Sequence, residues 1–344
     1  MRSLISVLWF VFFSRISIKA IVEDIRCMNF YGLETPRRRF VCDWQHNTMW
    51  YLERLKYDMF INTVRIPFSY DYVWQSDFKE LDKMVNDCNN MEIRIIFDFH
   101  RVFESHQSPA PDAEINLNQF LDTWYRLLDR YVNQSSAFGV GIFNEIQAAN
   151  AFDYANTIHS LIITNIEKRF PDRFYYFAGC PNWGGNCQHM NLSQMPTWNR
   201  TYIEVHKYIF SGDSNEKDWD VSIPPSILPQ QYFVGEFGWK QGSPNEREWG
   251  ERFIAYLKHR AIYNACAWTI AHSGDTEGWW KDDCETFQWD KASLLSSLWF
   301  GSMKRLRELG PANIPINSTM LHNFNSHTRF RANNQNLRAN NLTR

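Results

Sequence analysis

Eight short apolar runs recur along the chain, and most of them precede a segment whose apolar residues have helical spacing. Short apolar runs are typical of buried parallel strands, and apolar residues three or four apart are typical of amphipathic helices. Strands alternating with helices predict an α/β fold built on a parallel sheet. We expect strands at residues 25–31, 63–67, 93–97, 139–143, 174–177, 202–205, 232–235 and 264–268, and helices at 47–59, 78–89, 117–132, 149–170, 246–259 and 294–309.

Eight strands in this alternation favour a single (β/α)8 TIM barrel, with its functional face at the C-terminal ends of the strands. A chain of 344 residues is long enough for such a barrel, which typically needs about 250. A doubly wound open sheet is the alternative. It is disfavoured because no glycine-rich phosphate loop follows the first apolar run.

The two ends of the chain differ from the rest. A basic start at Arg2, an apolar run at residues 4–13 and a polar stretch ending at Ala20 predict a signal peptide over residues 1–20. A run of ten residues is too short to cross a bilayer core of about 30 Å, so we expect secretion and no membrane span. Residues 311–344 are rich in Asn and Arg and contain no acid, which predicts a flexible tail. The catalytic domain is then expected over residues 21–310.

The charge of the chain argues against a nucleic-acid partner. The net charge is −2, and the two terminal segments contain basic residues but no acid, so the body between them is more acidic still. An acidic body repels phosphate backbones. A neutral substrate fits this charge better.

Seven cysteines are compatible with an extracellular location, where disulfides form. Cys180 and Cys187 could close a small loop, and Cys266 with Cys284 is a second candidate pair. Because the number is odd, at least one cysteine stays free or pairs between chains. No His/Cys spacing indicates zinc. Five N-x-S/T sequons suit a glycoprotein of the secretory route and begin at Asn133, Asn191, Asn199, Asn317 and Asn341.

Polar residues follow the apolar runs at the strand ends. Glu145 comes directly after the run at 139–143, and Glu236 comes after the run at 232–235. Two carboxyl groups at one face of a barrel suggest a glycosidase. Further polar or aromatic residues at strand ends are Arg65, His100, Asn144, His206, Tyr208 and Trp268.

On these residues the chain resembles glycoside hydrolase family five, a retaining (β/α)8 family rich in endoglucanases. The resemblance extends from about residue 25 to residue 309 and includes all eight recurring active-site residues of the family. One departure is Ile146, where the family usually has proline. The matching stretches are Asn29-Phe30-Tyr31-Gly32-Leu33-Glu34-Thr35-Pro36, Val64-Arg65-Ile66-Pro67-Phe68, Asp98-Phe99-His100-Arg101, Phe143-Asn144-Glu145, His206-Lys207-Tyr208, Gly235-Glu236-Phe237-Gly238-Trp239, and Trp268 with Ser273-Gly274-Asp275-Thr276.

The resemblance implies that Glu236 is the nucleophile and Glu145 the acid/base, since a retaining glycosidase needs two carboxyl groups about 5–5.5 Å apart. Arg65 and Tyr208 would stabilise the charge of Glu236, and His206 would orient Glu145. The remaining supporting residues would be Asn144 at the sugar 2-hydroxyl, His100 beside the reacting sugar and Trp268 beneath it, with Trp183, Trp239 and Trp279 as possible aromatic subsites.

The function expected from the resemblance is a secreted endo-β-1,4-glycanase acting on a cellulose-like β-glucan by double displacement. No metal or organic cofactor is expected, and we expect a monomer whose partner is the polysaccharide. The alternatives are a β-mannanase or another β-glycosidase of the same barrel, and a catalytically silent glycan-binding protein. Retention of both carboxylates argues against the silent protein.

Overall fold

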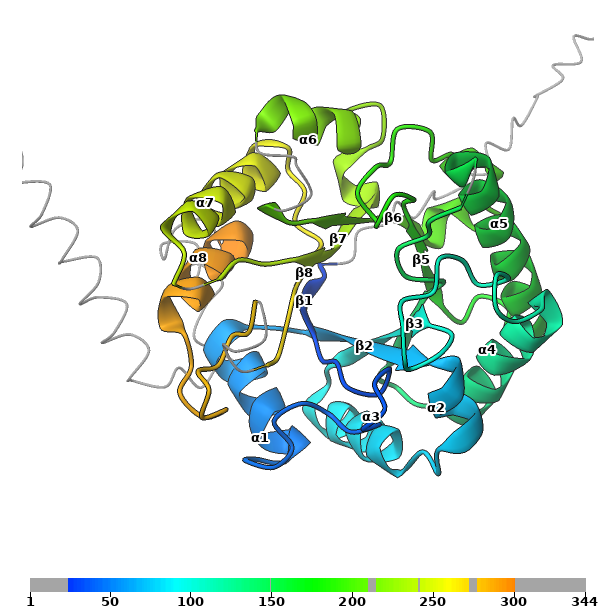
Figure 1. Cartoon of the computed structure of the whole chain (residues 1–344), viewed down its shortest axis with the longest axis horizontal. Coiled ribbons are helices and arrows are strands. Elements are labelled where there is room, and N and C mark those ends of the chain that lie inside the picture. The colour runs from blue at the N-terminus through cyan, green and yellow to red at the C-terminus, as the bar shows by residue number, and fades with distance from the viewer. Residues whose placement is uncertain (1–23, 149, 210–214, 241, 272–276, 301–344) are drawn as a thin grey trace, which may run out of the picture.

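The computed structural model describes residues 24–148, 150–209, 215–240, 242–271 and 277–300. Eight strands form a closed barrel in the order of the sequence, and helices surround it (Figure 1). Every pairing is parallel, including the pairing of β1 with β8 that closes the ring. The predicted (β/α)8 TIM barrel is therefore confirmed.

All eight predicted strands are present. Their apolar character is explained by position, because a strand in such a barrel is covered on both faces. Burial is complete in β2, β6 and β7, in which every residue is buried. The strands are β1 (Arg26–Asn29), β2 (Thr63–Ser69), β3 (Arg94–Arg101), β4 (Ala137–Gly141), β5 (Tyr175–Gly179), β6 (Thr201–Lys207), β7 (Tyr232–Phe237) and β8 (Ala265–Ala267).

The helices follow the predicted order, with two additions. Short helices α2 and α6 were not predicted, because the sequence shows too few turns of helical spacing there for a periodic pattern. Ser69 caps α2 and Asn215 caps α6 through side-chain oxygens that accept backbone N–H groups. The α-helices are α1 (Thr48–Glu53), α2 (Tyr70–Gln75), α3 (Lys79–Met91), α4 (Leu117–Tyr131), α5 (Ala151–Arg169), α6 (Glu216–Ser222), α7 (Pro244–His259) and α8 (Trp289–Phe300).

The core has two parts. The larger part packs the outward face of the strands against the helices. The smaller part includes Ile96, Phe177 and Tyr202, with the last two rings stacked at 5.1 Å between centroids. Ile96 and Tyr202 lie two residues before Asp98 and Glu204, so they share a strand face with those acids. The apolar interior of the barrel thus lies directly beneath a polar layer at the strand ends.

The described residues form three disulfides, two of which join distant parts of the chain. The predicted pair Cys180–Cys187 is confirmed. The predicted pair Cys266–Cys284 is wrong, because Cys266 on β8 lies opposite Cys27 on β1 and bonds to it across the closure of the barrel. Cys284 instead bonds to Cys42, which joins the loop after β1 to the loop after β8. Among the described residues Cys88 is a free, buried thiol.

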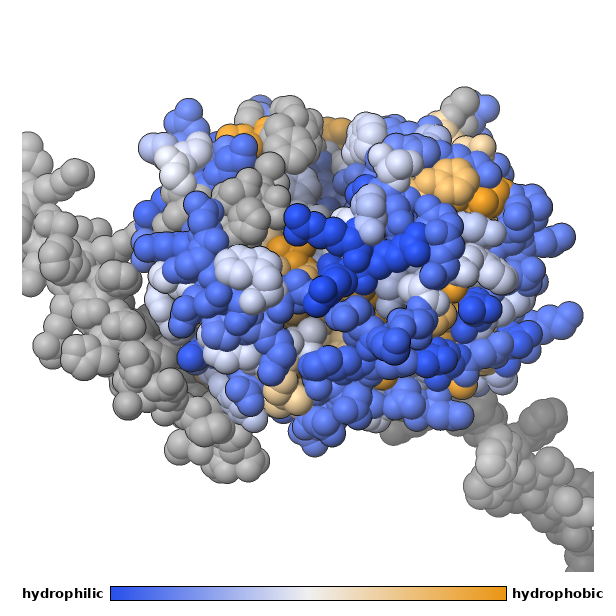
Figure 2. All heavy atoms as spheres, turned by 60° about the horizontal axis from the view of Figure 1, so that its bottom comes forward, coloured by the Kyte–Doolittle hydropathy of each residue, from blue (hydrophilic) through white to orange (hydrophobic). Residues whose placement is uncertain are grey.

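No described helix has the length and apolar character needed to cross a membrane. The face over helices α1 to α3 is mainly hydrophilic, with only scattered apolar residues among those coloured (Figure 2). The predicted signal at residues 1–20 and the predicted tail at 311–344 lie outside the described residues.

Candidate active site

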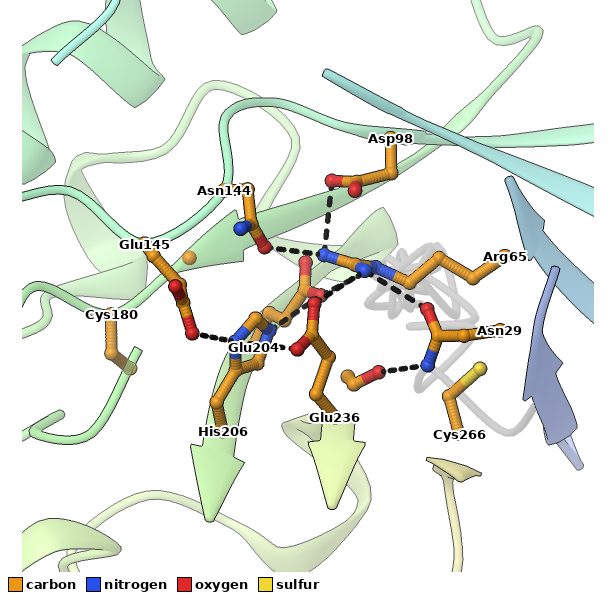
Figure 3. A network of polar contacts seen from close by, with 12 residues as sticks. Asn29, Arg65, Asp98, Asn144, Glu145, Cys180, Glu204, His206, Glu236 and Cys266 are labelled. Carbon is orange, nitrogen blue, oxygen red and sulfur yellow. Dashed lines mark hydrogen bonds and ion pairs between the residues drawn. The ribbon is translucent and has the colours of Figure 1, made fainter. Parts of the chain in front are cut away.

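Polar side chains converge at the C-terminal ends of the strands (Figure 3). Because side chains alternate along a strand, residues two apart project to the same side. Asp98 and His100 on β3 form one such pair, and Glu204 and His206 on β6 form another. Parallel strands in a closed ring bring these pairs to one face.

Arg65 on β2 is the centre of this layer, and its side chain is completely buried. Burial opposes its charge, but the surrounding carboxylates outweigh that cost and raise the pKa of the guanidinium. Arg65 therefore stays charged and fixes the groups around it. It forms ion pairs with Asp98 (3.0 Å), Glu204 (3.0 Å) and Glu236 (2.8 Å), and it donates hydrogen bonds to the side-chain oxygens of Asn29 (3.0 Å) and Asn144 (2.9 Å).

Glu236 on β7 is buried and held at both carboxylate oxygens. Arg65 donates to Oε1 at 2.8 Å, and the Tyr208 hydroxyl donates to Oε2 at 3.1 Å. Burial raises the pKa of Glu236, and nearby Glu145 adds to that rise, whereas His206 and Arg65 oppose it. The two donated hydrogen bonds favour the ionised form and fix the direction of the carboxylate.

Glu145 lies in the loop after β4 and is only partly buried. Its backbone has a φ of 50°, in the left-handed region, which costs a residue with a side chain about 1–3 kcal/mol. The neighbouring backbone is held by a hydrogen bond from the Asn144 N–H to the Phe99 carbonyl at 3.0 Å. The turn therefore aims the Glu145 side chain back over the barrel, toward His206 (Figure 3).

Glu145 and Glu236 face a common gap although they are far apart in sequence. One carboxylate oxygen of each, together with a ring nitrogen of His206, lie within 4.8 Å of one another. His206 Nδ1 lies 3.1 Å from Glu145 Oε1 and 3.7 Å from Glu236 Oε2. The structure thus brings together the two carboxyl groups that the sequence singled out.

His206 is held as a cation by its surroundings. Burial lowers the pKa of its ring, but Glu236, Glu145 and Glu204 more than offset burial and raise the pKa to about 10. Both ring nitrogens then carry protons. Nδ1–H points to Glu145, and Nε2–H points to Glu204 Oε1 at 3.3 Å.

His100, unlike the cationic His206, is held in its neutral form. Burial lowers the pKa of His100 well below its ordinary value, so the ring is neutral. Its Nδ1 lies 2.7 Å from Asp98 Oδ2, and a neutral ring donates its proton there. Burial also raises the pKa of Asp98 to about 7, although Arg65 opposes this. The other nitrogen, Nε2, remains as an acceptor near Asn144 Nδ2 at 3.5 Å.

An aromatic stack forms one wall of the site. The Trp268 ring lies against His100 with centroids 5.7 Å apart, and against Tyr31 with centroids also 5.7 Å apart. The peptide bond between Trp268 and Thr269 is cis. Trp268 remains partly exposed, so the stack presents an apolar surface beside the two glutamates.

Glu145, His206 and Glu236 are also the described residues best placed to hold a metal ion. Their chemistry disfavours one, because His206 carries both ring protons and Arg65 already occupies Glu236 Oε1. A divalent cation would have to displace a proton and compete with a buried guanidinium. The arrangement is better suited to stabilising one negative charge and moving one proton.

The model of the family described as cellulase (glycosyl hydrolase family 5) matches residues 22–274. That match covers most of the chain. The chain belongs to glycosyl hydrolase family 5. It is therefore a glycoside hydrolase that acts on O-glycosyl bonds.

Two curated endoglucanases are similar over most of the chain. An endoglucanase from Paenibacillus polymyxa is 22% identical, over 79% of this chain and 81% of its own. The major extracellular endoglucanase of Xanthomonas campestris pv. campestris is also 22% identical, over 81% of this chain and 68% of its own.

Solved structures share the barrel. An endocellulase from Pyrococcus horikoshii in complex with cellotetraose superposes with a TM-score of 0.71 at 20% identity, covering 80% of this chain and 92% of that one. The catalytic domain of the Xanthomonas endoglucanase gives a TM-score of 0.70 at 21% identity, covering 81% and 95%. At such identities the likeness concerns the fold.

Two of the three predicted aromatic subsites were wrong. Trp239 and Trp279 are 1% and 0% exposed, so neither ring faces a cleft. Their faces instead pack beside the ammonium of Lys291 from α8. Trp183 is 56% exposed and directly precedes Gly184, where an added Cβ would lie 2.7 Å from the His206 ring. Trp183 therefore remains a candidate subsite for this family 5 enzyme.

The sequence prediction missed three buried polar residues of the site, namely Asn29, Asp98 and Glu204. Asn29 Nδ2 donates to the carbonyls of Gly235 at 2.9 Å and Ala267 at 3.2 Å, which joins β1 to β7 and β8. A signal for the two acids was present, since each lies two residues before a predicted site histidine on the same strand.

Proposed function

We propose that this family 5 enzyme is a secreted, retaining endo-β-1,4-glucanase. The observation that carries the proposal is the approach of Glu145 and Glu236, whose nearest oxygens lie within 4.8 Å. Retaining glycosidases have carboxyl groups about 5–5.5 Å apart, whereas inverting enzymes need about 6.5–9.5 Å to admit a water molecule. The short gap supports double displacement.

In the first step Glu236 attacks the anomeric carbon, and the bond between that carbon and the glycosidic oxygen breaks. Glu145 gives its proton to the leaving oxygen, so the departing chain leaves as an alcohol. The product is a glycosyl ester of Glu236. In the second step water attacks the same carbon, Glu145 takes a proton from that water, and the ester bond to Glu236 breaks.

The polar layer supports both steps. Arg65 and Tyr208 donate to Glu236 and keep it ionised and oriented before attack. The His206 cation beside Glu145 stabilises the carboxylate that remains after proton transfer. Asn144, fixed by Arg65, is placed to hydrogen-bond the sugar 2-hydroxyl, a contact that strengthens in the oxocarbenium-like transition state.

The proposed substrate is a β-1,4-glucan. The Paenibacillus and Xanthomonas relatives are named endoglucanases, and the Pyrococcus endocellulase was solved with cellotetraose. The Trp268 wall and exposed Trp183 suit the apolar faces of sugar rings. Internal cleavage follows if Trp183 binds the chain beyond the scissile bond.

Secretion is supported by the signal-like residues 1–20, by the three disulfides and by the Xanthomonas relative, which is named extracellular. The sequons add that the protein carries N-linked glycans when made by a eukaryotic secretory route. Expression with residues 1–20 intact tests this directly. Mature protein in the medium that begins near residue 21 is expected, and retention of an uncleaved chain in cells would contradict it.

Two measurements test the enzymatic proposal. Reducing ends released from carboxymethylcellulose, mannan and xylan are compared, and carboxymethylcellulose is expected to give the highest rate. Proton NMR of the first products from cellotetraose is expected to show the β-anomer before mutarotation. Initial α-anomer would overturn the retaining mechanism, preference for mannan would overturn the substrate, and glycan binding without hydrolysis would leave a silent binding protein.

A further inference from the structure

The Glu204 carboxylate lies below the catalytic pair and is 3% exposed. Its Oε1 lies 3.0 Å from Arg65 Nε and 3.3 Å from His206 Nε2. Arg65 in turn contacts Glu236, and His206 contacts Glu145. Glu204 is thus the described acid that touches the partner of each catalytic carboxyl group while touching neither group itself.

The barrel leaves space for this carboxylate. Gly235, next to Glu236 on β7, faces it so closely that an added Cβ would lie 1.9 Å from Glu204 Oε1. Any larger residue at position 235 would push the Glu204 side chain away from Arg65 and His206. The glycine therefore allows close approach of the Glu204 side chain to the strand that bears the nucleophile.

Glu204 is ionised in this setting. Burial raises its pKa, but Arg65 and His206 outweigh burial and hold the pKa below its ordinary value. Asp98 also contacts Arg65 but has its pKa raised to about 7. Of the two buried acids that accompany Arg65 and Glu236, Glu204 is the one that keeps its negative charge at neutral pH.

We propose that Glu204 is a positioning residue for both catalytic carboxyl groups, acting on Glu145 through His206 and on Glu236 through Arg65. Through its contact with Nε2–H it fixes the ring of His206 so that Nδ1–H is aimed at Glu145. Through Arg65 it sets the guanidinium that orients Glu236. This inference rests on the proposed function, because it assigns Glu204 a part in the same hydrolysis.

The charged groups that face His206 come from two other elements of the barrel and from its own strand. Glu145 follows β4, Glu236 lies on β7, and Glu204 shares β6. Facing Glu204 are Arg65 on β2 and the neutral His100 on β3. Asp98 on β3 also influences His206 and Arg65. Removing only the Glu204 charge should therefore change the pKa of the His206 ring through one contact, that between Glu204 Oε1 and His206 Nε2.

The test uses the full-length enzyme and Glu204→Gln, which keeps the shape and removes the charge. We expect kcat/KM on cellotetraose to fall about 10- to 100-fold. Loss of a residue that orients a metal ligand has an effect of this size, and Glu204 orients His206 and Arg65 in the same way. The loss should be clearly smaller on dinitrophenyl cellobioside, whose leaving group needs little help from Glu145. Nitrogen-15 NMR should show His206 losing its imidazolium form at lower pH in the variant than in wild type.

Glu167→Gln is the matched control. Glu167 lies on α5 and pairs with Arg200 at 2.7 Å and with the Tyr176 hydroxyl, neither of which is a site residue, so this variant should keep wild-type kinetics. Unchanged kcat/KM and an unchanged His206 titration in folded Glu204→Gln would overturn the inference. If Glu204→Gln does not fold, the shortened Glu204→Asp carries the test with the same two readouts. If wild type hydrolyses neither substrate, the proposed function fails, and the His206 titration then decides only whether Glu204 holds the His206 ring as a cation.

Discussion

Arg65 and Lys291 are both buried cations, and the protein treats them in opposite ways. Arg65 is 0% exposed and has three carboxylates around it, which raise its pKa. Lys291 on α8 is 1% exposed, and its Nζ donates to the carbonyls of Glu277 (2.8 Å) and Gly278 (3.1 Å). Burial lowers the pKa of Lys291 to about 7, with only partial opposition from Glu277. Burial alone therefore does not decide the charge; the partners decide it.

The surroundings of the two cations explain their different roles. Lys291 Nζ lies 5.4 Å from the Trp239 ring and 4.9 Å from the Trp279 ring, so its nearest partners are carbonyl dipoles and indole faces. The carboxylates of Glu277 and Glu246 favour its charge but do not outweigh burial. These contacts pack a loop against α8 and include no direct ion pair of the kind that surrounds Arg65. Around Arg65 the partners are the carboxylates of Asp98, Glu204 and Glu236, and Glu236 is itself one of the catalytic pair. The first arrangement serves structure, and the second organises chemistry.

Replacing each cation by methionine tests whether Arg65 serves catalysis and Lys291 serves structure. Arg65→Met should lower kcat/KM by at least about 10²- to 10³-fold, as loss of a fixed charge-stabilising donor does, and should destabilise the fold by about 3–5 kcal/mol, because it leaves buried carboxylates unpaired. Lys291→Met should keep kcat near the wild-type value. Equal loss of activity in the two folded variants would contradict the separation into chemical and structural cations.

A buried tryptophan, Trp239, and an exposed one, Trp183, should also respond differently to substitution. Trp239→Ala removes a fully buried ring beside Lys291 and should cost about 3–5 kcal/mol of stability in denaturant unfolding. Trp183→Ala removes an exposed ring and should cost within about 0.5 kcal/mol. Trp183→Ala should instead raise KM for cellotetraose. Unchanged KM there would remove Trp183 from the list of subsites.

Lys291 and His206 should contribute to the pH dependence of folding stability with opposite signs. Lys291 has a folded pKa of about 7, below its ordinary 10.5, so between these values only the unfolded chain binds the proton, and stability rises with pH. His206 has a folded pKa of about 10, above its ordinary 6.5. Its contribution is full below pH 6.5 and is lost as pH rises through 10.

Lys291→Met and His206→Asn isolate these two contributions. Between pH 7 and 10 the stability of wild type relative to Lys291→Met should increase, and its stability relative to His206→Asn should decrease. Chemical denaturation at several pH values measures both differences. If the two stability differences changed with pH in the same direction, the charge states assigned to Lys291 and His206 would be wrong.

Metal removal should have the smallest effect. The cluster of Glu145, His206 and Glu236 could offer three ligand atoms, but a protonated His206 and the Arg65 contact disfavour a cation there. Hydrolysis after treatment with EDTA should equal that of untreated enzyme. A loss that is restored by added zinc or magnesium would show that this cluster works through a metal.

The sequence predicted the strands and their polar ends well for a physical reason. Buried parallel strands have a local apolar signature, and a closed ring of such strands brings their C-terminal ends to one face. Glu145 and Glu236 could therefore be placed together without knowledge of any contact. Both strands can be recognised from the apolar residues directly beside each glutamate in the sequence.

The failures concern features that depend on distant parts of the chain. Trp239 lies two residues after β7 and Trp279 lies in the loop after β8, and only the arrival of Lys291 from α8 shows that both are covered. The pairing of Cys266 with Cys27 depends on the closure of β8 onto β1. The role of Glu204 depends on contacts with Arg65 on another strand and on His206.

The most direct test of the account is to trap the covalent intermediate. Wild-type enzyme is treated with a 2-deoxy-2-fluoro cellobioside bearing a dinitrophenyl leaving group, digested, and analysed by mass spectrometry. One glycosyl adduct is expected, on the peptide that contains Glu236, and no adduct is expected in Glu236→Ala. An adduct on Glu145 or on any other residue of active enzyme would contradict the assignment of the two carboxyl groups.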